Sequence, residues 1–172
     1  MEEKGLLEGV VVLDLSRVLA GPYCGMLLAD MGATVIKVEN PDGGDDSRRL
    51  WPFVGEGSAY YTNYNRSKLG CTLNLREPEA KEIFKEMVKK ADIVIENYRP
   101  GTMEKLGLGY DVLKEVNPGI IYGSVSAFGH TGEISDVGGH IYTDRSWGRF
   151  TDRYHVGYVI LGKPSGFICH II

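Results

Sequence analysis

The sequence lacks any long apolar run and any surplus of positive charge. No hydrophobic stretch among the 172 residues approaches the roughly 20 that a transmembrane helix requires, and the start, Met1 to Gly5, has no basic region followed by an apolar segment. We therefore expect no membrane contact and a cytoplasmic location. Lysine and arginine total 19 against 23 aspartate and glutamate residues. Such a surface is not suited to neutralising nucleic acid phosphates, so we expect no nucleic acid partner.

Cysteine is scarce as well. Cys24, Cys71 and Cys169 are an odd number and form no close Cys-x-x-Cys pair, which argues against a disulfide framework and against a bound metal. They are expected to be small buried residues. With 43% hydrophobic residues, the chain is long enough for one well-cored domain.

Three segments near the amino terminus predict a βαβ unit. Val10–Leu15 is a short, β-branched apolar run, typical of a strand covered on both faces. Pro22 suits the start of a helix, and Tyr23–Met31 is dense in Met, Leu and Ala before Gly32 closes it. A second strand is expected at Thr34–Val38. This succession predicts a right-handed crossover between parallel strands.

Strands and helices continue to alternate as far as Ser126. The loop Asn40–Arg49 has turn residues and no periodicity, and its acidic side chains are expected to be solvated. The alternation predicts an α/β protein with a Rossmann-like open parallel sheet and helices on both faces. The elements expected after the loop are a strand at Cys71–Leu75, a helix opening at Glu77, a strand at Ala91–Glu96, helices at Thr102–Leu106 and Tyr110–Val116, and a strand at Gly119–Ser126.

The turn Arg17–Pro22 follows the first expected strand, at the sheet edge where open α/β folds bind ligands. Its backbone amides suit an anion, although a tight turn that needs only Gly and Pro explains the same residues. Lys37 is either a solvated strand-edge charge or part of a site. Glu39 is placed where a dinucleotide fold binds a ribose, but the first turn lacks Gly-x-Gly-x-x-Gly, so no nicotinamide cofactor is expected.

Several short motifs, taken together in order and spacing, resemble family III coenzyme A transferases. This group includes formyl-CoA transferase, carnitine-CoA transferase and the α-methylacyl-CoA racemases. The motifs are Leu19-Ala20-Gly21-Pro22, Val35-Ile36-Lys37-Val38-Glu39 with Gly44-Asp45 and Arg48, Asn65-Arg66-Ser67-Lys68, and Asn97-Tyr98-Arg99-Pro100-Gly101 with Leu106-Gly107.

The resemblance implies coenzyme A or acyl-CoA as a substrate, with no permanently bound cofactor. Coenzyme A carries a diphosphate, a ribose 3′-phosphate and an adenine, so its site should offer cations at intervals and a flat or apolar surface. In the family an aspartate attacks the acyl-CoA, and coenzyme A then passes to a carboxylic acid. The coenzyme-binding residues that the resemblance implies are Val18, Leu19, Lys68, Asn97, Tyr98, Arg99 and Lys105.

The expected catalytic groups are harder to find. The nucleophilic aspartate is expected near position 170, where Gly166–Ile172 contains no carboxylate, and neither Asp144 nor Asp152 has the Gly-Asp setting of the family. Gly139-His140 is similar to the Gly-His-Asp of the racemases, but Ile follows. Three hypotheses therefore stay open: the amino-terminal part of a CoA-transferase, either active or inactive as this chain, a racemase-like enzyme that moves a proton at the α-carbon, and a coenzyme A-binding fragment without catalysis.

The motif pattern stops near Gly132. We expect residues 1–132 to form the Rossmann-like coenzyme A-binding region, and residues 133–172 to form a divergent or truncated tail without regular periodicity. The resemblance implies a homodimer of interlocked rings. We expect this chain to lack the second domain and the return segment that such a dimer requires.

Overall fold

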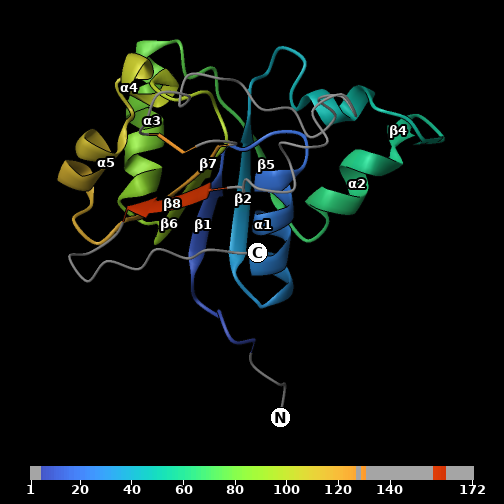
Figure 1. The fold of residues 1–172 in the computed structure, drawn as a ribbon, viewed down its shortest axis with the longest axis horizontal. Coiled ribbons are helices and arrows are strands. Elements are labelled where there is room, and N and C mark those ends of the chain that lie inside the picture. Colours follow the sequence, from blue (N-terminus) through green and yellow to red (C-terminus); the bar gives the residue numbers. More distant parts are fainter. Residues whose placement is uncertain (1–4, 127–128, 131–156, 162–172) are drawn as a thin grey trace, which may run out of the picture.

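A six-stranded sheet runs through the part of the chain described by this computed structural model, which comprises residues 5–126, 129–130 and 157–161 (Figure 1). The strand order is β5-β2-β1-β6-β7-β8. Neighbouring strands from β5 to β7 are parallel, and β8 pairs antiparallel with β7, with Tyr122 opposite Leu161. The strands are β1 Val11–Asp14, β2 Thr34–Glu39, β5 Leu69–Thr72, β6 Ile93–Glu96, β7 Ile121–Ser126 and β8 Gly157–Leu161.

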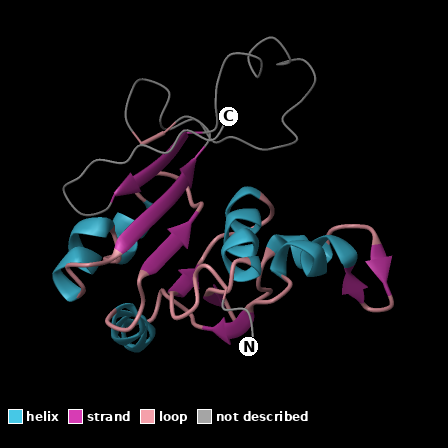
Figure 2. Cartoon of the chain, turned by 90° about the horizontal axis from the view of Figure 1, so that it is seen from below, coloured by secondary structure: helices cyan, strands magenta, loops and turns pink. Residues whose placement is uncertain are grey.

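Helices cover both faces of the sheet. Helix α1 lies on one face, and α3, α4 and α5 lie on the other (Figure 1). The helices are α1 Ala20–Asp30, α2 Ala59–Asn65, α3 Pro78–Val88, α4 Thr102–Leu106 and α5 Tyr110–Val116, with a 3-10 turn η1 at Asp46–Arg49. A small hairpin, β3 Phe53–Val54 with β4 Gly57–Ser58, stands at the opposite end of the molecule from β8 (Figure 2).

Alternation along the strands divides the core into two clusters. Val12 and Ile95 pack beneath α1, whereas Leu13 and Val94, one residue away, pack against α3 to α5. Successive strand residues point to opposite faces, so a strand covered on both sides must be apolar throughout. Fully burying one large apolar side chain contributes about 1.5–3 kcal/mol to folding stability. Such burial holds helices against both faces of the sheet.

Helix α3 shows how the sequence sets these contacts. Pro78 occupies its first turn, where the missing N–H is not needed, and Ala80, Phe84 and Val88 recur every four residues and are buried. The predicted α/β fold with a parallel sheet and helices on both faces is confirmed. The helices predicted at Thr102–Leu106 and Tyr110–Val116 have those bounds in the structure.

Several predicted bounds differ from the structure. Helix α1 begins at Ala20, so Pro22 is its third residue, and β5 lies at Leu69–Thr72 instead of Cys71–Leu75. Helix α2 was not predicted, because its polar, aromatic sequence has no apolar period; it is capped by Ser58, whose hydroxyl oxygen accepts a hydrogen bond from the Tyr61 N–H. Strand β8 lies in the segment where no pattern was found.

The strand order reverses between β1 and β6. From β1 the chain moves outward to β2 and β5, then returns to β6 on the other side and continues to β7. The connections that follow β1 and β6 therefore lead to helices on opposite faces of the sheet, α1 on one and α4 on the other, and open α/β sheets bind ligands in the crevice at such a point.

Candidate functional site

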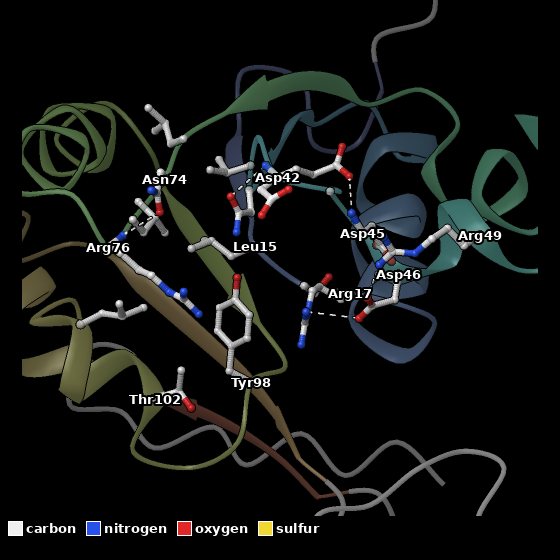
Figure 3. Close-up of a pocket in the computed structure, with 18 residues that line it drawn as sticks. Leu15, Arg17, Asp42, Asp45, Asp46, Arg49, Asn74, Arg76, Tyr98 and Thr102 are labelled. Atoms are coloured by element: carbon white, nitrogen blue, oxygen red, sulfur yellow. Dashed lines mark hydrogen bonds and ion pairs between the residues drawn. The ribbon is translucent and has the colours of Figure 1, made fainter.

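A cavity of about 330 Å³ opens at this switch point (Figure 3). Its size is within the range of small-molecule sites. The lining residues come from the segments that follow β1, β2, β5 and β6 and from α4. They are Leu15, Ser16, Arg17, Val38, Glu39, Asn40, Asp42, Gly44, Asp45, Asp46, Arg49, Leu73, Asn74, Leu75, Arg76, Tyr98, Thr102 and Leu106.

Asn97 holds the turn after β1 against the turn after β6. Its side-chain oxygen accepts a hydrogen bond from the Arg17 N–H at 2.7 Å, and its Nδ2 donates to the Arg17 carbonyl, also at 2.7 Å. One amide side chain thus satisfies both backbone groups of Arg17. Gly21 is required behind this turn, because a Cβ there would lie 2.2 Å from the Ser16 Cβ.

A buried ion pair next to β2 forms hydrogen bonds with the same turn after β1. Lys37 Nζ lies 3.0 Å from Asp45 Oδ2 and donates to the Ser16 carbonyl at 2.6 Å. Asp45 Oδ1 accepts from the Val18 N–H at 3.0 Å and from the backbone N–H of Ser47 at 2.9 Å. The side chains of Lys37 and Asp45 are 2% and 0% exposed. The expectation that the acids of the Asn40–Arg49 loop are solvated is wrong for Asp45, and Lys37 is not a solvated strand-edge charge.

Two effects set the ionisation of Asp45. Burial opposes the charged form, but the Lys37 charge and the hydrogen bonds from Ser47 and Val18 outweigh it, and the pKa of Asp45 is lowered. Val18 itself has φ of 68°, in the left-handed region that β-branched residues rarely adopt. The carboxylate therefore stays ionised beside an unusual backbone conformation.

Glu39 is the last residue of β2, and both of its carboxylate oxygens accept hydrogen bonds from neighbouring residues. Arg48 donates to it from Nε at 2.9 Å and from Nη2 at 2.6 Å, and the Tyr61 hydroxyl donates at 3.1 Å. Burial raises the pKa of Glu39, but the contacts with Arg48, the Asp45 N–H and Tyr61 overcome it, and the net pKa is lowered. Sequence reasoning had included Arg48 in a motif but missed Tyr61, which comes from the unpredicted α2.

Lys68 lies inside the protein beneath α1. Its Nζ donates to Asp14 Oδ2 at 2.8 Å, to the Pro22 carbonyl at 2.8 Å and to Asn65 Oδ1 at 3.0 Å. Its side chain is 1% exposed and that of Asp14 is 0% exposed. All three ammonium protons are therefore engaged, and Lys68 does not line the cavity. Its contact with coenzyme A stays a prediction.

Tyr98 places a ring in the cavity, between Arg76 and Arg17 in Figure 3. The Arg17 guanidinium lies 5.6 Å from the ring centroid and 3.2 Å from Asp46. The Tyr98 N–H donates to Glu96 Oε2 at 2.7 Å. This contact fixes the start of the turn that follows β6.

The remaining predicted residues, Leu19, Arg99 and Lys105, are not among those that line the cavity. Leu19 is the N-cap of α1, and its carbonyl accepts the Tyr23 N–H at 2.7 Å. Arg99 is exposed in the turn after β6, and Lys105 is exposed on α4, whose Thr102 and Leu106 line the cavity. The structure thus brings Val18, Asn97 and Tyr98 together at the switch point. Arg99 and Lys105 lie on the neighbouring segment.

Comparison with known proteins identifies the family. The sequence profile of CoA-transferase family III matches residues 7–147. The chain belongs to this family. Human succinyl-CoA:glutarate CoA-transferase is 48% identical over 136 residues, which are 78% of this chain and 31% of that protein. Succinyl-CoA:mesaconate CoA-transferase of Haloarcula marismortui is 51% identical over 141 residues, 78% of this chain and 35% of that protein.

The fold of this family III chain has solved counterparts. The crystal structure of a CAIB/BAIF family protein from Brucella suis superposes with a TM-score of 0.79 at 37% identity. The match covers 98% of this chain and 44% of the Brucella protein. The chain spans about 31–40% of the length of its curated relatives.

Three cation-bearing residues of the family III cavity were missed by sequence reasoning. Arg17, Arg49 and Arg76 line it, yet they are separated in the sequence and meet only because parallel strands share one carboxyl edge. A position shortly after a predicted strand was the available signal for Arg17 and Arg76. His140, Asp144 and Asp152 lie outside the described residues.

Two further properties concern the described part of the family III chain. None of its helices is long and apolar enough to cross a membrane. Within the same residues there is no cluster of three or more histidine, cysteine, aspartate or glutamate side chains that suits a metal ion.

Proposed function

We propose that this chain is a coenzyme A-binding part of a family III CoA-transferase. The observation that carries the proposal is the cavity at the reversal of strand order, whose lining includes Glu39, Gly44, Asp45, Tyr98 and Leu106 from the family motifs. Val18 and Leu19 open α1 on one side, and Asn97 and Tyr98 follow β6 on the other.

The cavity offers three guanidinium groups to the phosphates of coenzyme A, beside four carboxylates, of which Asp46 is paired with Arg17 and Arg49. Arg17, Arg49 and Arg76 line the cavity, and the exposed Arg99 and Lys105 follow β6. Guanidinium and ammonium groups bind phosphates through charge-assisted hydrogen bonds. The ring of Tyr98 supplies an aromatic surface for an adenine or for the pantetheine arm. We place the diphosphate and the 3′-phosphate of the coenzyme among these cations.

The proposed reaction moves coenzyme A from an acyl-CoA to a carboxylic acid. The names of the relatives pair succinyl-CoA with glutarate or mesaconate, and acetyl-CoA with oxalate. A dicarboxylic acid is therefore the proposed acceptor, with succinyl-CoA as the first donor to test. A carboxylate nucleophile would attack the thioester carbonyl of the acyl-CoA and expel the coenzyme A thiolate, which leaves an acyl anhydride. Attack of the thiolate on the enzyme carbonyl of the anhydride would release the donor carboxylate and leave an enzyme thioester, from which coenzyme A passes to the acceptor acid. We propose that this chain binds coenzyme A, and a transfer assay decides whether it also completes the reaction.

Titration calorimetry of the 172-residue chain with coenzyme A tests the binding. Arg99→Ala and Lys105→Ala should each weaken it by about 1.5–3 kcal/mol, the range for hydrogen bonds to charged groups. Lys89→Ala removes an exposed lysine paired with Glu86 and serves as the control, with unchanged affinity. If both variants bind coenzyme A as tightly as the wild type does, Arg99 and Lys105 lie outside the site. If the wild-type chain binds no coenzyme A, the proposal is contradicted.

Transfer is measured separately, as formation of glutaryl-CoA from succinyl-CoA and glutarate. Binding without product identifies a non-catalytic coenzyme-binding chain, whereas turnover shows that a nucleophile is present elsewhere in the sequence. The homodimer implied by the family resemblance is a separate question from coenzyme binding. Analytical ultracentrifugation of the chain with and without coenzyme A tests it.

A further inference from the structure

The turn between β1 and α1 is held by side chains that line or adjoin the cavity but belong to other elements. Lys37 holds the Ser16 carbonyl at 2.6 Å, and Asp45 holds the Val18 N–H at 3.0 Å. The two groups form an ion pair, whose side chains are 2% and 0% exposed. The positions on both sides of Arg17 are therefore fixed by one buried charge pair.

The contacts of Lys37 and Asp45 with this turn matter most for the backbone conformation of Val18. Its φ is 68°, although valine carries a branched Cβ that clashes in the left-handed region. A residue held in such a conformation persists only when surrounding contacts determine it. Glycine would adopt the same φ without this steric penalty. The chain uses valine, and the contact on the Val18 N–H comes from Asp45.

Asp45 is itself held in place for this contact. Its Oδ1 accepts the Ser47 N–H at 2.9 Å and the Ser47 hydroxyl at 2.7 Å, and its own N–H donates to Glu39 Oε1 at 2.8 Å. The Lys37 ammonium faces Oδ2 as an ion pair without a well-aligned hydrogen bond. These contacts leave the carboxylate with little freedom to follow Val18 if the turn relaxes.

From this geometry we infer that Asp45 is a positioning residue for coenzyme binding. Together with Lys37 it keeps Val18 in the left-handed conformation, so that the turn is already in its binding form before the ligand arrives. The inference rests on the proposed function for its ligand. Without the carboxylate the turn populates other conformations. The apparent affinity for coenzyme A then falls in proportion to the fraction of molecules whose turn keeps the binding conformation.

A double-mutant cycle between Asp45 and Val18 tests the inference. Asp45→Ala should raise the dissociation constant for coenzyme A about tenfold, which corresponds to about 1.4 kcal/mol. In a Val18→Gly background the same substitution should cost at most about threefold, because glycine adopts the positive φ without a steric penalty. Asp45→Asn keeps an oxygen acceptor and should lose less affinity than Asp45→Ala. Asp111→Ala removes an exposed aspartate on α5 and is the matched control.

Amide hydrogen exchange at Val18, measured by NMR on the free chain, provides a readout without ligand. Asp45→Ala should accelerate this exchange about tenfold while amides of β1 and β6 change little. The inference would be overturned if Asp45→Ala weakened coenzyme A binding by the same factor in the wild-type and Val18→Gly chains. An unchanged exchange rate of the Val18 amide in Asp45→Ala would overturn it as well. If Asp45→Ala does not fold, the cycle is run with Asp45→Asn. If the wild type takes up no coenzyme A, the proposed function fails, and the exchange rate still decides the role of Asp45.

Discussion

Replacing Lys68 by methionine should destabilise the folded chain by about 3–5 kcal/mol, the cost of removing one partner of a buried ion pair. Lys68 and Asp14 have side chains 1% and 0% exposed, and their charged atoms lie 2.8 Å apart. Without the ammonium, the Asp14 carboxylate keeps, within the described part of the chain, its contacts from Ser16. The Pro22 carbonyl and Asn65 lose the same donor.

This loss is large relative to the stability of a typical domain. Folded proteins are stable by about 5–15 kcal/mol in total, so the variant should remain folded only marginally. With a urea slope of about 2 kcal/mol per molar, the midpoint of unfolding should fall by about 2 M. Far-UV circular dichroism in a urea series measures this shift.

Two controls distinguish the cost of leaving a buried charge unpaired from the cost of removing a lysine side chain. Lys89→Met removes a lysine from an exposed pair with Glu86, 53% and 66% exposed, and should change stability by less than about 0.5 kcal/mol. Adding Asp14→Asn to Lys68→Met should recover at least about 1 kcal/mol, because the uncompensated charge is removed. Full stability of Lys68→Met together with weakened coenzyme A binding would refute this reasoning and return Lys68 to the ligand site.

Two other perturbations test the contacts around the turn. The pKa of Glu39 is lowered by folding, so its ionised contacts stabilise the protein above the ordinary carboxyl pKa and are lost as pH falls through the folded value. The difference in unfolding free energy between wild type and Glu39→Gln should therefore narrow between about pH 7 and about pH 3, and a constant difference in urea titrations would contradict the assigned contacts. Gly21→Ala should cost about 1–3 kcal/mol or more by overpacking against Ser16, because the added Cβ would lie 2.2 Å from the Ser16 Cβ. Gly70→Ala is the control, since a Cβ there meets nothing within 4 Å; equal thermal stability of the two variants would show that the turn has room.

The fold could be predicted because it depends on local signals. Val10–Leu15 has the apolar, β-branched composition of a strand covered on both faces, and the Phe84 and Val88 spacing marks the buried face of α3. Helix α2 carries no comparable signal. Its residues are held by a Ser58 cap and by contacts with distant elements, so its position is decided by tertiary structure.

The site could be predicted only in outline. The motif around Asn97 and the turn containing Val18 were located correctly at the carboxyl edge of the sheet. The burial of Lys37, Asp45 and Lys68 could not be read from the sequence, because a charged residue looks the same whether it meets solvent or a partner far along the chain. Lys68 and Asp14 are 54 positions apart, and no local pattern links them.

The paired charges beneath the turn constrain how this protein can evolve. A substitution at Lys37 alone would leave the Asp45 charge buried without its partner, and a substitution at Asp45 alone would do the same to Lys37, so either single step should lower the stability of the protein. A library randomised at both positions, selected for soluble expression, should therefore return matched combinations, either acid with base or two neutral residues. The two sites would vary in concert, as would Asp14 and Lys68.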